Sequence, residues 1–501
     1  MHRRVLTTLA ALTSAGLLGT PAAGAAPNAP GPEVHSPEYV ARDVQNMTDA
    51  YGRIHAPGGQ LRNPAYLQGL VAESTELTVA QLMTQLANPL RPSVTPAVAV
   101  PGWNIGNPLR KRWERDRGRM RPVQFTNEYG ALLRGHVYRP ARRAKDPYTG
   151  RKIRGPYPGV VITTGSVQGS EGMYEWLAQD LAERGYVVLT YDVQGQGDSE
   201  TLPHESGEQF PFCDPSAEPR EGEMTGCPGV PSQQLSNFVV GTENAIDFFM
   251  STPRKPYANP GSAGVEVDGH NPFWKSFDRS KDRTPHTPGR RTRLAIVGHS
   301  MGASAVSKVQ GTDRRVMAVV ALDKLTGPDS SGALDGSGNV PVVPALALQA
   351  EYGFAVTPYP MSGGSSITPE PSPDGPDPRR ERATGYDAWA AAGVDTMLVV
   401  PRASTHLEWT DIPLVLPASR YGQALSSVYT QLWLDRYLKD RRNDRKLLGK
   451  RFPYLEPIGA GEWERTILKR DRLLSFYYCS AYRIETRDGV RRDGDVTGVG
   501  C

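Results

Sequence analysis

The chain has 501 residues, of which 38% are hydrophobic and 22% are charged, a composition typical of a globular protein that excludes disorder throughout. This length is enough for one large domain with insertions or for two domains. The near balance of 57 basic and 53 acidic residues, a formal net charge of +4, argues against a protein that binds nucleic acid.

Residues 1–25 have the pattern of a secretory signal peptide. Two arginines precede the short apolar stretch Val5–Leu18, and Ala23-Gly24-Ala25 is a small-residue cleavage site. The apolar stretch is too short to span a bilayer, so we expect no stable membrane anchor. Cleavage near Ala25 would lower the basic count from 57 to 55 and leave a net charge of about +2. The sequence therefore predicts a secreted protein, and the short segment before the apolar stretch favours the general secretory route over the twin-arginine route.

Residues 26–110 are predicted to form a helical extension and a linker. Apolar residues recur along Val40–Tyr51 and Tyr66–Leu86, as in helices that pack on a larger domain. A basic run follows at residues 110–121, but Glu114 and Asp116 interrupt it. This mixture of charges indicates a solvated linker rather than a surface that grips an anion.

A mostly parallel α/β domain is predicted over residues 111–440. Its first edge is a hairpin of Pro122–Thr126 and Ala131–Tyr138. From Gly159 onward, strands alternate with helices, which is typical of a central sheet covered by helices on both faces. The expected strands are Val160–Thr163, Val187–Asp192, Leu294–Val297, Val316–Leu322, Ala345–Ala350 and Thr396–Val400. The expected helices lie at about residues 173–184, 235–251, 302–310, 386–392 and 418–439.

Three irregular insertions interrupt this domain, at residues 195–234, 252–290 and 356–382. The third leaves the end of a strand and is rich in Pro, Gly and Ser, so it fits either a lid over a substrate or an exposed connector. Residues 441–501 are predicted to form a small C-terminal appendage that contains a strand-like stretch, Leu473–Ile484.

Four cysteines in an exported chain indicate disulfide bonds, because such proteins fold in an oxidising compartment. Three pairings are possible. We favour Cys213 with Cys227 and Cys479 with Cys501, since each pair closes a short polar loop. No histidine or further cysteine lies at ligand spacing beside either pair, so no metal site is expected.

Residues Leu294–Gln310 have the pattern of a nucleophile elbow. An apolar strand leads into Gly298-His299-Ser300-Met301-Gly302, and a helix of small residues follows. The two glycines allow the tight strand-to-helix turn that raises the Ser300 hydroxyl above the edge of the sheet. The five-residue pattern also occurs by chance, but its position between a strand and a helix indicates that Ser300 is a nucleophile. The side chain of His299 is expected to point elsewhere at this turn.

A serine hydroxyl becomes a good nucleophile only when a base takes its proton and an acid orients that base. On a sheet with this kind of elbow the acid and then the histidine follow the serine in sequence. Among nine histidines, His406 alone lies beyond Ser300, and it comes directly after the last predicted strand. His406 is therefore the predicted base.

The acid is expected where a strand ends, because the site is assembled at that edge of the sheet. Asp323 follows the strand Val316–Leu322, and Glu351 follows Ala345–Ala350. The usual position is after the later strand, so we favour Glu351, with Asp323 as the alternative and Asp329 as a third candidate. Either of the first two also fits a structural role as a carboxylate that caps a loop.

Two backbone N–H groups should stabilise the negatively charged oxygen of a tetrahedral intermediate. Met301, the residue after the nucleophile, offers one of them. Ser166, in the turn Thr164–Gly169 after the first parallel strand, is the expected second donor. This turn lacks the glycine spacing and the lysine of nucleotide-binding loops, so no phosphate ligand or cofactor is expected.

These residues together resemble the α/β-hydrolase superfamily across about Pro122–Lys439. Within it, Thr164-Gly165-Ser166, Gly185-Tyr186 before Asp192, the GHSMG elbow and the C-terminal cysteine pair look like secreted actinobacterial esterases related to cutinases, polyester hydrolases and dienelactone hydrolases. The resemblance implies Ser300 as nucleophile, His406 as base and the N–H groups of Ser166 and Met301 as the oxyanion hole. These relatives place an aspartate where this chain has Gly353, so the resemblance does not supply the acid.

The leading hypothesis is a secreted serine hydrolase that cleaves a small-molecule or polymeric carboxylic ester through an acyl-enzyme. A peptidase or an acyltransferase on the same triad is an alternative, as is a catalytically silent binding module with the same fold. The sequence leaves the oligomeric state open.

Overall fold

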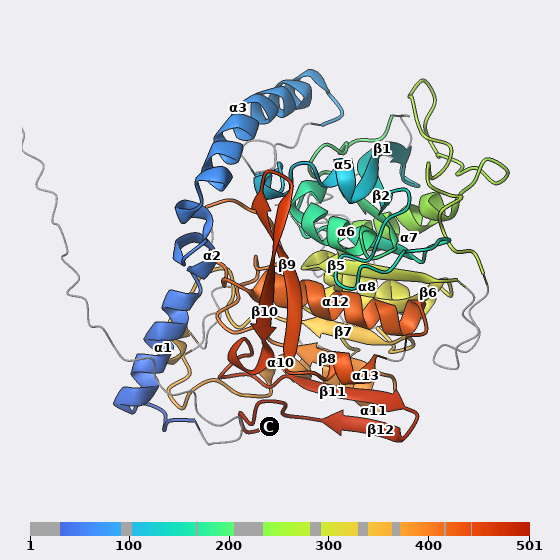
Figure 1. Ribbon diagram of the computed structural model, residues 1–501. Helices are drawn as coiled ribbons and strands as arrows, with labels where there is room; N and C mark the ends of the chain where they lie inside the picture. Colours follow the sequence, from blue (N-terminus) through green and yellow to red (C-terminus); the bar gives the residue numbers. More distant parts are fainter. Residues whose placement is uncertain are drawn as a thin grey trace, which may run out of the picture.

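The computed structural model describes residues 31–91, 103–166, 169–204, 234–280, 292–328, 339–362, 371–414, 417–441 and 443–501. Within these residues, a ten-stranded sheet runs through the molecule in the order β1-β2-β4-β3-β5-β6-β7-β8-β11-β12 (Figure 1). Its strands are β1 (Gly118–Thr126), β2 (Leu132–Pro140), β3 (Gly159–Thr163), β4 (Val187–Tyr191), β5 (Leu294–His299), β6 (Val316–Leu322), β7 (Ala345–Leu348), β8 (Thr396–Val399), β11 (Ala481–Thr486) and β12 (Gly489–Asp493).

The six strands from β4 to β8 in this order are parallel, and the strands outside them pair antiparallel. The parallel strands are buried from end to end, which explains their apolar sequences. The predicted hairpin is confirmed, with Phe125 opposite Leu133 in its register. Because all parallel strands end at one edge, the loops after them converge there.

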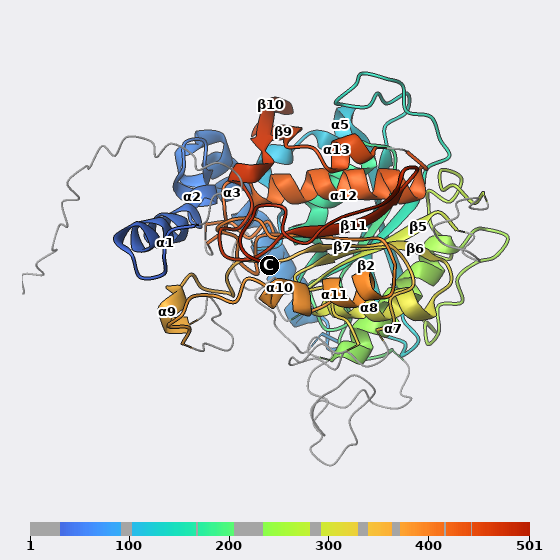
Figure 2. The ribbon, with the colours of Figure 1, turned by 90° about the horizontal axis from the view of Figure 1, so that it is seen from below.

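Helices cover both faces of the sheet. The helices α6 (Glu175–Ala182) and α12 (Gly422–Leu438) pack with one buried cluster of apolar side chains. The helices α7 (Leu235–Met250), α8 (Met301–Thr312) and α11 (Tyr386–Ala391) pack with a second cluster. Figure 2 shows α12 and these three helices on opposite sides of the strands. The arrangement, together with the strand-turn-helix at Ser300, is the expected α/β-hydrolase fold.

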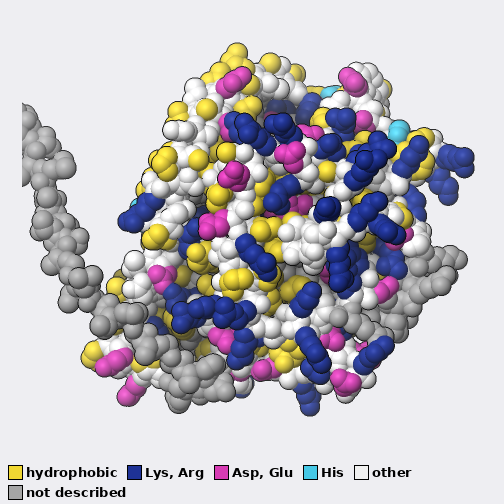
Figure 3. Space-filling model, viewed as in Figure 1, with side chains coloured by type: hydrophobic (Ala, Val, Ile, Leu, Met, Phe, Trp, Pro, Cys, Tyr) yellow, Lys and Arg dark blue, Asp and Glu magenta, His cyan; other side chains and the backbone are white. Residues whose placement is uncertain are grey.

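The N-terminal extension, residues 31–91, forms a column along one side of the molecule (Figure 1). Its helices are α1 (Pro37–Asp49), α2 (Gly52–His55), η1 (Gln60–Arg62) and α3 (Pro64–Ala87). The helix α1 buries Asp43 and Asn46 and exposes Val40 and Val44 by about half. The helix α3 likewise buries polar side chains and exposes Val71, Val79, Met83 and Leu86. Apolar side chains consequently lie along this edge in Figure 3.

The basic run at residues 110–121 is not the solvated linker that its charges indicate. It contains part of η2 (Pro108–Arg110), the short helix α5 (Trp113–Asp116) and the start of β1. Trp113 is 1% exposed, and the buried Arg110 pairs with Asp180 at 2.8 Å. One buried aromatic residue and one buried ion pair therefore fix this segment to the domain.

Residues 443–501 are only partly an appendage. The strands β9 (Arg451–Gly459) and β10 (Glu462–Lys469) form a separate hairpin, whereas β11 and β12 extend the central sheet past β8. The expected disulfide between Cys479 and Cys501 is confirmed, and it joins the segment just before β11 to Cys501. Cys213 and Cys227 lie outside the described residues.

The remaining short helices connect these elements, namely η3 (Glu171–Tyr174), α9 (Tyr359–Ser362), α10 (Arg380–Ala383), α13 (Asp444–Leu447) and η5 (Arg470–Arg472). In the part of the chain that the structure describes, every helix is too short or too polar to cross a membrane.

Candidate active site

Ser300 lies at a tight turn between β5 and α8. Its φ of 56° and ψ of −122° are a conformation that residues with a side chain rarely adopt. Glycine is required on both sides of it. A Cβ on Gly298 would lie 2.0 Å from the carbonyl oxygen of Gly302, and a Cβ on Gly302 would lie 2.4 Å from that of Thr164. The expected strand-turn-helix therefore presents a half-buried serine at the carboxyl edge of the sheet.

His406 and Asp323 complete a line of hydrogen bonds that begins at Ser300. The Nε2 atom of His406 is 2.9 Å from the Ser300 Oγ, and its Nδ1 atom is 2.6 Å from the Asp323 Oδ2. Asp323 follows β6, the neighbour of β5 in the sheet, and His406 follows β8. Both residues are buried, with exposed fractions of 4% for Asp323 and 8% for His406. This is the geometry in which an imidazole can accept the serine proton.

The charge of Asp323 is maintained although its surroundings are dry. Burial raises its pKa, but the hydrogen bond and charge of His406, the charge of Lys324 and the N–H of Ala350 outweigh that effect and lower the pKa to about 2. The carboxylate is consequently ionised at neutral pH. It accepts a hydrogen bond from the Nδ1–H of His406, which leaves Nε2 as the acceptor that faces Ser300.

Glu351, the favoured acid, is bonded elsewhere. Its carboxylate accepts hydrogen bonds from Asn46, from Ser475 Oγ at 2.6 Å and from the backbone N–H of Ala403 at 2.6 Å. The preference for Glu351 over Asp323 does not match this geometry, because the partners of Glu351 are Asn46 in α1, Ala403 and Ser475, and none of them is His406. No local sequence pattern reveals those partners. The third candidate, Asp329, lies outside the described residues.

The two expected oxyanion donors flank the serine. Met301 is the first residue of α8, directly after Ser300. The turn that carries Ser166 lies against the elbow, since a Cβ on the preceding Gly165 would be 3.3 Å from the Cβ of Ser300. Their role as the oxyanion hole stays a prediction that this placement permits.

His299 links the two loops behind the nucleophile, which the sequence did not indicate. Its Nε2 donates to the carbonyl oxygen of His406 at 2.8 Å, and its Nδ1 accepts from Tyr174 Oη at 2.7 Å. The same Tyr174 oxygen accepts from the N–H of Gly165 at 2.9 Å. Burial lowers the pKa of His299 to about 3, so the ring is neutral. The role of His299 depends on Tyr174, a buried partner 125 residues away in the chain, so no local sequence pattern could reveal it.

Phe354 provides an apolar surface beside the base. Its ring lies 4.5 Å from the His406 ring in an edge-to-face arrangement, and the residue is 39% exposed. The irregular stretch that follows is anchored at Tyr359, which is buried against Tyr352 and Tyr477. The choice between lid and connector for residues 356–382 stays open, because residues 363–370 lie outside the described part.

The described residues contain no group of three or more His, Cys, Asp or Glu side chains that could hold a metal ion. The side chains around Ser300 instead have the arrangement of an acid-base-nucleophile site.

Comparisons with known proteins add little to this geometry. No protein-family model matches the chain. An uncharacterised protein of Pseudomonas aeruginosa is 30% identical over 123 residues, which are 24% of this chain and 31% of that protein, so the match spans about a third of that relative. Among solved structures, a ferulic acid esterase from Streptomyces cinnamoneus aligns with 65% of this chain and 92% of its own, at 17% identity and a TM-score of 0.37. The fold assignment rests on the sheet topology and the elbow.

Proposed function

We propose that the protein is a secreted serine hydrolase that cleaves carboxylic esters through an acyl-enzyme. One observation carries the proposal: Ser300, His406 and Asp323 form an unbroken line of hydrogen bonds, 2.9 and 2.6 Å long, at the carboxyl edge of the sheet. Secretion is supported by the pattern of residues 1–25 and by the disulfide at the C-terminus.

In the first half of the reaction, His406 Nε2 takes the Ser300 proton while Oγ attacks the ester carbonyl carbon. Asp323 stabilises the imidazolium that forms, and the N–H groups of Met301 and Ser166 bind the negatively charged oxygen. The tetrahedral intermediate then collapses. The bond to the alcohol breaks, and the His406 proton passes to the alcohol oxygen.

In the second half, water replaces the alcohol. His406 takes a proton from the water as its oxygen attacks the acyl carbon, and the proton then passes to Ser300 Oγ as the carboxylic acid leaves. The ring of Phe354 beside His406 offers an apolar contact for the ester group that approaches this base. A small ester and an ester within a polymer are both candidates for the substrate.

The test replaces Ser300 by alanine. Ser300→Ala should lower the hydrolysis of short p-nitrophenyl esters by at least ~10³-fold and abolish labelling by a fluorophosphonate. Ser304→Ala is the matched control, since Ser304 lies in the same helix one turn further along and is not part of the triad. A Ser300→Ala variant as active as the wild type would refute the proposal.

The same experiment separates the alternatives. A catalytically silent binding module predicts that the wild type neither turns over esters nor reacts with the fluorophosphonate. A peptidase or an acyltransferase would label at Ser300 but would prefer peptide substrates or alcohol acceptors, which product analysis distinguishes.

A further inference from the structure

The N-terminal extension is attached to the loops around Ser300 by polar contacts from one side. Asn46 and Asp49 lie three residues apart near the end of α1, and Arg53 lies in α2, the short helix that follows. Asn46 donates to Glu351 and to Tyr352 Oη, in the loop after β7. Asp49 pairs with Arg402, directly after β8. The extension therefore contacts two of the loops that end at the site.

Arg53 makes the contacts that lie nearest to His406 in sequence. Its Nη1 donates to the carbonyl oxygen of Thr410 at 2.8 Å, and its Nη2 donates to the carbonyl oxygen of Glu408. The same Nη2 is 3.3 Å from the Glu408 carboxylate. In addition, the backbone N–H of Arg53 donates to the carbonyl oxygen of Ala418 at 3.0 Å. One guanidinium thus holds two carbonyl groups and one carboxylate of the segment that carries His406.

We call residues 403–414 the His406 loop. The structure describes all of them, and none is in a helix or a strand. The loop therefore has no regular ladder of hydrogen bonds and depends on bonds from other elements, among them His299 to the His406 carbonyl. The Arg53 guanidinium binds this loop at Glu408 and Thr410, which follow His406 in the sequence.

Glu408 makes the Arg53 contact hard to replace. The Glu408 side chain is fully buried, and its carboxylate also accepts the N–H and the hydroxyl of Ser419 at 2.8 and 2.9 Å. Burial raises the pKa of Glu408, and the charge of Arg53 opposes that shift. Without Arg53, a buried carboxylate would lose its counter-ion, and the loop would rearrange to reach water or another donor.

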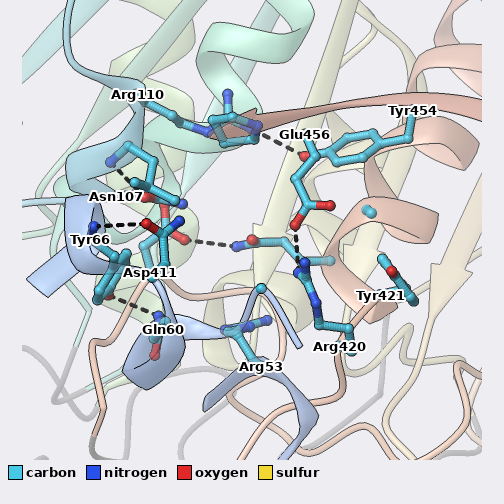
Figure 4. A pocket seen from close by; sticks show the side chains of 16 residues that line it. Arg53, Gln60, Tyr66, Asn107, Arg110, Asp411, Arg420, Tyr421, Tyr454 and Glu456 are labelled. Atoms are coloured by element: carbon cyan, nitrogen blue, oxygen red, sulfur yellow. Dashed lines mark hydrogen bonds and ion pairs between the residues drawn. The ribbon is translucent and has the colours of Figure 1, made fainter. Parts of the chain in front are cut away.

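A pocket of about 60 Å³ lies beside Arg53 (Figure 4). Polar side chains are prominent in its lining, with Tyr66 and Gln60 from the extension and Asp411 and Arg420 from later in the chain. In Figure 4 the Arg53 side chain extends among them. A small cation from solvent can therefore approach the place that the Arg53 guanidinium occupies.

We propose that the N-terminal extension is a working part of the active site and that Arg53 is its positioning residue. The guanidinium fixes the His406 loop so that His406 Nε2 stays within hydrogen-bond distance of Ser300 Oγ. Displacement of a reacting group by ~1 Å costs on the order of 10²-fold in rate, so a modest movement of this loop is enough to impair catalysis. This inference rests on the proposed hydrolase function.

The experiment compares Arg53→Ala with Arg62→Ala in the full-length secreted protein, using p-nitrophenyl acetate as the probe. Arg62 is an exposed arginine of the same extension, in η1, and serves as the matched control. For Arg53→Ala we expect kcat to fall by ~10- to 100-fold while KM changes by less than ~3-fold, because the substrate contacts are unchanged. Millimolar guanidinium should restore kcat of Arg53→Ala by several-fold and leave Arg62→Ala unchanged.

Hydrogen exchange measured by mass spectrometry gives a readout that does not need turnover. Exchange in residues 403–414 should be at least ~10-fold faster in Arg53→Ala than in the wild type, with β5 and β6 unchanged. The inference is overturned if kcat and this exchange stay within twofold of the wild type. It is also overturned if activity falls without guanidinium rescue and exchange rises throughout the sheet.

Failure of the proposed function would be recognised separately. If wild type and Ser300→Ala are equally inactive toward esters and equally unlabelled, the hydrolase proposal fails. Exchange in residues 403–414 still decides in that case whether Arg53 holds the loop.

Discussion

Asp323 and Glu351 differ in what their carboxylates face, although both follow strands that end at the same edge. Asp323 Oδ1 accepts the N–H of Ala350 at 3.1 Å, so the ends of the two neighbouring strands are in direct contact. Asp323 uses its other oxygen for His406, whereas Glu351 faces Asn46, Ser475 and Ala403. The orientation of one side chain, not the position of the strand, distinguishes the carboxylate that we propose as the acid.

This difference predicts opposite results for two isosteric variants. Asp323→Asn should lower kcat toward p-nitrophenyl esters by ~10³- to 10⁴-fold, because the amide cannot stabilise the imidazolium or hold the required tautomer. Glu351→Gln should lower kcat by less than ~10-fold but reduce the free energy of unfolding by ~1–3 kcal/mol, because the buried bonds of a carboxylate are replaced imperfectly. Steady-state kinetics and urea unfolding measure both. A loss of activity confined to Glu351→Gln would reverse the assignment.

The pKa values around the triad predict a simple pH dependence. Asp323 has a pKa of about 2 and His299 of about 3, so neither group titrates above about pH 4. Because neither group changes its charge above about pH 4, the acid side of the kcat/KM profile should involve a single proton there. A plot of log kcat/KM against pH should have a slope of one there. A slope of two would show that a second group of the site titrates.

The Asp323 carboxylate should contribute to the stability of the fold down to low pH. The folded-state pKa of Asp323 lies below the ordinary value of 3.8, so its contribution to stability is present above that value and is lost as the pH falls toward about 2. Circular dichroism at each pH of the kinetic series checks that the acid side of the rate profile is not caused by unfolding.

At the scale of elements, the elbow was predictable because its whole signal is local. An apolar strand, two glycines and a helix of small residues lie within 17 consecutive positions, Leu294–Gln310. The strand β11 has no such signal for its place. Residues 473–480 before it are irregular and supply Ser475 and Tyr477 to contacts with Glu351 and Asp43. Only the pairing of β11 with β8, about 85 residues earlier in the chain, adds it to the central sheet.

The disulfide of the C-terminal hairpin, β11 and β12, should contribute measurably to the free energy of unfolding. The bond between Cys479 and Cys501 spans 22 residues that include β11 and β12, the strands at one edge of the sheet. Cys501→Ser should lower the free energy of unfolding by ~2–3 kcal/mol, since it releases this loop in the unfolded chain. Denaturant unfolding without reductant measures the change. Val499→Ala, in the same segment, keeps the bond and is the control; equal losses in the two variants would contradict the prediction.

At the scale of the whole molecule, the sequence determines most of the sheet but not the contacts between distant segments. The order of strands and helices, Ser300 and the position of His406 follow from periodicity and from chain order. The acid, the role of His299 and the Arg53 contact depend on partners that are 83, 107 and 355 residues away. The basic run shows the same limit, because the burial of Arg110 depends on Asp180. The sequence shows that Arg110 is charged, but it does not show which residue Arg110 contacts in the folded chain.

The four cysteines provide one test of both export and disulfide pairing. If the chain is exported, the purified protein should begin at Ala26. If both expected pairs form, it should contain no reactive thiol without reductant and four reactive thiols after reduction in denaturant. The bond between Cys479 and Cys501 accounts for two of them. Cys501→Ser should release one thiol, Cys479, while a peptide map still joins the peptides of Cys213 and Cys227. Two free thiols in the unreduced wild type, located at Cys213 and Cys227, would refute that pairing and leave the C-terminal bond as the one formed.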